Sequence, residues 1–95
     1  MKIRSFAHKG LKRLYDDDMA KGVPADAVDK LRKMFVFLDA MQKVEELRAL
    51  TNWKVHVLTG DREGIWSFTV TRNRRLTFRV DDENEICDVD LEDYH

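Results

Sequence analysis

The chain is short of the residues on which several classes of protein depend. Its single cysteine, Cys87, cannot form a disulfide within the chain, and no apolar run approaches the roughly 20 residues of a membrane-spanning helix. Residues 1–6 lack the apolar segment of a signal peptide. Gly60 and Gly64 are typical of a turn rather than of a phosphate-binding loop, and no two histidines or cysteines stand at the spacing of metal ligands. We therefore expect a cytoplasmic protein with no membrane segment, no metal and no cofactor.

The chain also has no large excess of either sign of charge, but its acidic and basic residues are unevenly distributed along the sequence. The 17 lysines and arginines nearly balance the 18 acids, for a net charge of -1. All 17 bases lie in residues 1–80 together with 10 acids, whereas residues 81–95 hold eight acids and no lysine or arginine. This asymmetry predicts a basic binding surface beside an acidic segment, although a solvated body with a solubilising tail has the same composition.

Apolar spacing in the first half of the chain predicts helices. Ninety-five residues, of which 43% are hydrophobic, are enough for a single domain spanning residues 1–95. Periodicity predicts helices over residues 8–19 and 24–40 and a helical turn over 44–50, after a short strand over residues 2–6. Gly22 suits the position after a helix end, and Pro24 suits the first turn of the next helix. We expect His8, near the first helix start, to be structural or incidental.

From Trp53 onward the apolar period changes to two. This predicts four strands over residues 53–58, 65–71, 74–80 and 86–91. The connections between them are short, so neighbouring strands should be antiparallel. The predicted fold class is α+β, with two N-terminal helices packed on one face of a mainly antiparallel sheet of four to five strands.

The alternation assigns each strand residue to one of two faces. The face expected to meet the helices is apolar and comprises Trp53, Val55, Val57, Trp66, Phe68, Val70, Leu76, Phe78, Val80, Cys87, Val89 and Leu91. The opposite face is polar and comprises Lys54, His56, Ser67, Thr69, Thr71, Arg75, Thr77, Arg79, Asp88 and Asp90. The polar face thus combines His56 with the cations Arg75 and Arg79 of a central strand. An antiparallel sheet can also have a wet face that has no function, and the pattern leaves that reading open.

Four stretches of the sequence together resemble one known family. They are residues 3–6 with 9–15, residues 57–67 with the motif Gly60-Asp61-Arg62, the strand 75–78, and the ending 88–95, which closes on Asp-Tyr-His. The combination runs essentially end to end and is similar to the HigB toxins of the RelE and ParE superfamily.

The resemblance implies a RelE-like fold and a type II toxin–antitoxin pair. It implies a ribosome-dependent mRNA endonuclease, or mRNA interferase, which cuts translated mRNA in the ribosomal A site and arrests growth. The implied partners are the ribosome, mRNA and a HigA-type helix-turn-helix antitoxin that holds the toxin inactive. We expect the toxin itself to be monomeric.

The resemblance also implies catalytic roles for His56, Arg75, Asp93, Tyr94 and His95. Metal-free RNA cleavage needs a base for the ribose 2′-hydroxyl proton, an acid for the leaving 5′-oxygen and positive charge beside the transition state. Imidazoles suit both proton transfers, and an arginine fork suits phosphate. Asp93 can orient an imidazole and Tyr94 can stack on a base. Which histidine is the base stays open, while the α-carboxylate on His95 favours its protonated form and so the acid role.

Four further cations are candidate RNA contacts: Lys54, Arg62, Arg74 and Arg79. Relatives often carry lysine where this chain has Thr59, and Lys54 or Arg62 can supply that charge. Arg74 stands where relatives commonly carry tryptophan. RNA binding further requires that most acids from residue 81 onward face away from the basic surface.

Other readings of the same residues stay open. A ParE-like toxin would inhibit DNA gyrase and would need no histidine pair. A toxin without nuclease activity would act only as a co-repressor with its antitoxin. For the terminal tripeptide alone, an unstructured chain end is the ordinary expectation.

Overall fold

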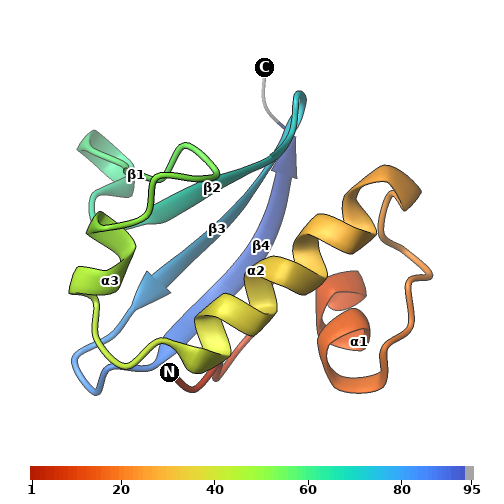
Figure 1. Cartoon of the computed structure of the whole chain (residues 1–95), viewed down its shortest axis with the longest axis horizontal. Helices are drawn as coiled ribbons and strands as arrows, with labels where there is room; N and C mark the ends of the chain where they lie inside the picture. The colour runs from red at the N-terminus through yellow and green to blue at the C-terminus, as the bar shows by residue number, and fades with distance from the viewer. Residues whose placement is uncertain (94–95) are drawn as a thin grey trace.

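A four-stranded antiparallel sheet forms one layer of the molecule, and helices form the other. The computed structural model describes residues 1–93. The strands β1 (His56–Val57), β2 (Trp66–Thr71), β3 (Arg74–Val80) and β4 (Ile86–Asp93) lie side by side in that order. Helices α1 (Lys9–Asp17) and α2 (Val28–Ala40) lie over one face of the sheet (Figure 1). The predicted fold class is therefore confirmed.

Capping residues decide where α1 begins and ends. The Nδ1 atom of His8 accepts a hydrogen bond from the Leu11 amide at 3.1 Å, which satisfies a free N–H of the first turn. Asp18 takes a left-handed conformation, with φ 56°, and closes the last turn. The helix thus spans Lys9–Asp17 rather than residues 8–19, and His8 has a structural role rather than an incidental one.

The predicted second helix has a tighter first turn than expected. Pro24 precedes the 3-10 turn η1 (Ala25–Ala27), and α2 continues from it to Ala40. Leu31, Met34 and Leu38 on its inner side are fully buried, as the apolar spacing predicts. The short helix α3 (Glu45–Arg48) follows. None of the helices in residues 1–93 has the length and apolar character needed to cross a bilayer.

The first sheet strand is much shorter than the predicted strand over 53–58. Trp53 and Lys54 have positive φ angles of 63° and 45°, so the backbone turns before β1 begins. The Trp53 ring still packs inward, 5.8 Å from Phe37 and 5.3 Å from Phe68 between ring centroids. Val57, expected on the apolar face, is 39% exposed.

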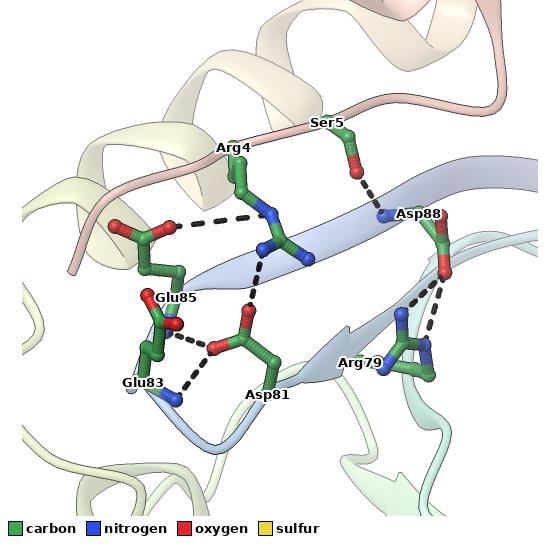
Figure 2. Close-up of polar contacts among 7 residues, drawn as sticks. All are labelled: Arg4, Ser5, Arg79, Asp81, Glu83, Glu85 and Asp88. Carbon is green, nitrogen blue, oxygen red and sulfur yellow. Dashed lines mark hydrogen bonds and ion pairs between the residues drawn. The ribbon is translucent and has the colours of Figure 1, made fainter.

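The N-terminal segment lies beside β4 but does not form a regular strand. Ile3 and Phe6 make isolated parallel bridges to Ile86 and Val89 in place of the strand predicted over residues 2–6. Figure 2 shows how side chains fasten this segment to the β3–β4 hairpin. Arg4 forms an ion pair with Asp81 at 3.0 Å.

A β-bulge at Asp88 shifts the register of β4 by one residue. Thr77 faces Asp90, whereas Arg79 faces Cys87. Asp88 has a φ of 57°, and its amide donates to Ser5 Oγ at 2.9 Å (Figure 2). The extra residue allows both Ile86 and Val89 to be buried in the core although three positions separate them.

Cys87 lies on a different face from the one predicted. It is fully buried but stands opposite Arg79, outside the hydrophobic cluster between the sheet and the helices. Its side chain contacts Arg4, and this contact is the largest cause of the raised pKa of that guanidinium. The strict alternation assumed for residues 86–91 was wrong because the bulge interrupts it.

Candidate active site

The polar face of the sheet carries a cleft. Antiparallel pairing aligns His56, Ser67, Thr77 and Asp90 in one row across the four strands. The cleft, of about 250 Å³, begins at His56 and Ser67 of this row and extends toward the β2–β3 turn. It is lined by Lys54, His56, Ser67, Thr69, Thr71, Arg72, Arg74 and Arg75. Strand parity had assigned most of these residues to one face, and the pairing brings them together.

The cleft is cationic. Four of its lining residues are Lys54, Arg72, Arg74 and Arg75, and no acid lines it among residues 1–93. Of the sequence-predicted residues, Lys54, His56, Arg74 and Arg75 meet here. Arg72 was missed because it lies in the two-residue β2–β3 turn, although a turn of that length holds it beside the strand ends. Such a surface suits a polyanion with a phosphate at its centre.

The end of β4 reaches the rim of the cleft. Asp93 pairs in register with Arg74, and their Oδ1 and Nε atoms lie 3.5 Å apart. The strand thus continues beyond the predicted end at Leu91. Tyr94 and His95, the other predicted catalytic residues of the tail, lie outside the described residues.

The two remaining predicted RNA contacts, Arg62 and Arg79, are not among the residues that line the cleft. Arg79 pairs with Asp88 at 2.9 Å (Figure 2). Arg62 makes a two-point contact with Glu92, whose Oε1 accepts from Nη1 at 2.7 Å. This contact with Arg62 is the main reason that the pKa of Glu92 lies below its ordinary value. Both arginines already have carboxylate partners.

Half of the eight acids of the acidic segment lie in a turn away from the cleft. The β3–β4 turn, residues 81–85, stands at the opposite end of β3 from the β2–β3 turn, about 20 Å away for a seven-residue strand. The Asp81 carboxylate has local partners: it accepts from the Glu83 and Glu85 amides at 3.0 and 2.9 Å and pairs with Arg4. This separation is what RNA binding by the basic surface requires.

Metal ligands do not cluster in this part of the chain. Across residues 1–93, no three histidine, cysteine, aspartate or glutamate side chains are placed to hold a metal ion. The groups that the cleft does offer are an imidazole, three guanidinia and an ammonium. Together these can bind a phosphodiester and transfer a proton beside it.

Solved structures define the class of protein to which this fold belongs. A YoeB/ParE toxin from Agrobacterium tumefaciens shares the fold with a TM-score of 0.59 at 18% identity, covering 97% of this chain and 99% of that one. The YoeB-YefM toxin-antitoxin complex from Staphylococcus aureus contains a chain with a TM-score of 0.60 at 19% identity, covering 100% and 99%. The molecule has the fold of these small bacterial toxins.

Sequence comparison narrows the class to a family. The model of the HigB-like toxin family, RelE-like toxins of type II toxin-antitoxin systems, matches residues 4–95. The Endoribonuclease HigB of Proteus vulgaris is 41% identical over 93 residues, which cover 98% of this chain and 99% of that protein. The chain belongs to the HigB-like toxin family, and the resemblance drawn from its motifs is confirmed.

Proposed function

We propose that this protein is a ribosome-dependent endoribonuclease that cuts translated mRNA in the ribosomal A site. The observation that carries the proposal is the convergence of His56 with Lys54, Arg74 and Arg75 in one cleft whose rim is reached by Asp93. Membership of a toxin family and the named activity of the Proteus vulgaris relative support it.

The reaction assigned to the cleft is a metal-independent transesterification. A base removes the proton of the ribose 2′-hydroxyl, the oxygen attacks the adjacent phosphorus, and an acid protonates the leaving 5′-oxygen. A 2′,3′-cyclic phosphate and a 5′-hydroxyl result. His56 and His95 supply the base and the acid, because an imidazole pKa of about 6.5 suits both transfers. Arg75 holds the phosphate and stabilises the charge that builds up on it.

The remaining groups support binding. Lys54 and Arg74 contact the RNA backbone, and Lys54 supplies the charge that relatives place at residue 59. Asp93 orients an imidazole, and Tyr94 stacks on a base. Arg62 and Arg79 are left out of the direct contacts because neither lines the cleft, whereas Arg74 does.

The partners of the proposed activity are the ribosome, mRNA and an antitoxin. We infer a HigA-type antitoxin with a helix-turn-helix domain, a monomeric toxin when it is free, and action in the cytoplasm, where mRNA is translated. The complex of the Staphylococcus aureus toxin with its antitoxin supports this kind of partnership.

Mapping RNA ends after induction tests the proposal. Expression without antitoxin should arrest growth and produce cuts inside translated reading frames. Removal of His95, or a tag placed after it, should abolish these cuts while the urea unfolding midpoint is retained. Arrest that survives both His56→Ala and removal of His95 would indicate gyrase inhibition instead. Absence of arrest by the unaltered protein would indicate a co-repressor.

A further inference from the structure

The Glu92 carboxylate has partners from two other elements of the fold. Glu92 stands in register with Arg75 of β3, and its side chain is only 23% exposed. Its Oε1 accepts from Arg62 Nη1 at 2.7 Å, while Oε2 contacts Arg62 Nη2 and accepts from Thr77 Oγ1 at 2.5 Å. This is a shared, two-point contact rather than a loose surface pair.

The contact joins opposite edges of the sheet. Arg62 belongs to the turn η2 (Gly60–Arg62), which follows β1, and β1 and β4 are the two edge strands. At a strand spacing of about 4.8 Å the link spans roughly 14 Å and passes over β2 and β3. We call the loop of residues 59–63 with its Arg62–Glu92 ion pair the strap.

Two polar side chains of the sheet face opposite the helices are buried. Ser67 and Thr77 are 4% and 2% exposed. Thr77 directly contacts the carboxylate that receives Arg62. The Arg62–Glu92 contact therefore lies beside Thr77 on the polar face.

The strap also borders the cleft. Ser67 and Arg75 line the cleft and pair in register with Thr77 and Glu92. The two ends of the loop are joined at its base, where the Leu58 amide donates to the Ile65 carbonyl at 2.8 Å. Backbone pairing thus holds the base of the loop, and the Arg62 side chain connects the loop to Glu92 of β4.

We propose that Glu92 is a positioning residue for RNA cleavage, which fixes the loop of residues 59–63 to β4 through Arg62 and neutralises that guanidinium beside the cleft. The inference rests on the proposed endoribonuclease function. It gives Arg62 a structural role in place of the RNA contact predicted from the sequence. Because the Arg62 guanidinium is neutralised by Glu92, the RNA phosphate binds the cations of the cleft rather than Arg62.

Two variants break the strap from opposite sides. Glu92→Gln keeps the side-chain volume and an acceptor for Thr77 but removes the negative charge, whereas Arg62→Ala removes the positive charge. Both should slow cleavage of mRNA on programmed ribosomes by about ten- to a hundredfold, since small displacements of catalytic groups have such effects. The double variant should be no slower than either single one, because one interaction is lost in each case.

RNA affinity separates positioning from a general loss of structure. Binding is measured to a single-stranded 2′-O-methyl oligonucleotide, which lacks the attacking hydroxyl. Glu92→Gln should bind it more tightly, with the dependence of log K on log salt steeper by up to about 0.7, because Arg62 becomes available to phosphate. Arg62→Ala should bind no more tightly than the parent. Slower cleavage with tighter binding is a combination that partial unfolding does not produce.

A matched ion pair on the other side of the molecule serves as the control. Arg32 contacts Asp18 through two guanidinium nitrogens, at 3.0 and 2.9 Å, and is 45% exposed, close to the 43% of Arg62. Arg32→Ala should leave cleavage unchanged. Amide hydrogen exchange of residues 60–63 should accelerate in Glu92→Gln and Arg62→Ala but not in this control.

The possible results separate a failure of the role proposed for Glu92 from a failure of the proposed endoribonuclease function. Parental cleavage rates in Glu92→Gln, or unchanged amide exchange in its loop, would overturn the role of Glu92 while leaving the endoribonuclease proposal intact. Failure of the unaltered protein to cut ribosome-bound mRNA would overturn the proposed function, and loop exchange would still decide whether the strap exists.

Discussion

At position 88, substitutions should rank in stability in the reverse of the order usual for a β-strand. In a regular strand, valine is more favourable than glycine. At residue 88 the φ angle is 57°, a conformation that costs a β-branched residue most and glycine nothing. We therefore predict that the free energy of unfolding falls in the order Asp88→Gly, Asp88→Ala, Asp88→Val.

The size of each step follows from the local geometry. Alanine in this conformation costs about 1 kcal/mol relative to glycine, and valine about 2 kcal/mol or more. All three variants lose the ion pair with Arg79, which is worth under about 1 kcal/mol because both side chains are exposed. The glycine variant should thus lie within about 1 kcal/mol of the parent.

Equilibrium unfolding in urea, followed by tryptophan fluorescence at pH 7, measures the series. Equal m-values would show that the variants differ in stability rather than in the extent of unfolding. In a domain of this size, 1 kcal/mol corresponds to a shift of about 4–8 °C in Tm. A valine variant as stable as the glycine variant would refute the bulge and leave the joint burial of Ile86 and Val89 without a cause.

Three further predictions concern stability and titration. Gly10→Ala should lower the free energy of unfolding by about 1–3 kcal/mol, since an added Cβ would lie 2.7 Å from a backbone carbonyl oxygen; an unchanged urea midpoint would contradict the close approach. Burial and a hydrogen bond to Asp39 raise the pKa of Tyr15 from 10.0 to about 12. Because the Tyr15 phenol stays protonated to a higher pH in the folded state than in the unfolded state, the free energy of unfolding should decline as the pH rises between these two values. In an ultraviolet titration of Tyr15→Phe, the phenol that ionises at the higher pH should be absent. The pKa of Glu92 is lowered in the folded state, so the Glu92 carboxylate contributes fully to the free energy of unfolding above about pH 4.5 and loses this contribution as the pH falls below that value. The parent and Glu92→Gln should therefore converge in stability in acid. A difference in stability that does not depend on pH would contradict this.

Strand parity predicted the composition of the cleft because β2 and β3 keep a period of two through their central residues. Ser67, Thr69 and Arg75 lie on the predicted face, and Trp66 and Phe78 lie on the other. Short connections allowed the antiparallel order of the strands to be predicted as well. Local sequence contains this information, because side-chain alternation depends on neighbouring residues alone.

Two of the errors, the start of β1 and the register of β4, fall where the backbone adopts a left-handed conformation at a residue other than glycine. Trp53 and Asp88 have positive φ angles, which nothing in their own sequence context requires. Ser5 stabilises the second of these from the far end of the chain. The Arg62–Glu92 ion pair could not be predicted from the sequence either, because the two residues are 30 positions apart and both resemble ordinary surface charges.

Cleavage of a defined mRNA by the purified protein, with and without ribosomes, tests the proposed activity and its active site together. We expect cuts within the A-site codon of programmed ribosomes and no cuts in free mRNA. Both His56→Ala and Arg75→Ala should lose cutting while their urea midpoints stay close to that of the parent. Undiminished cleavage by these two variants would contradict the assignment of the cleft as the active site.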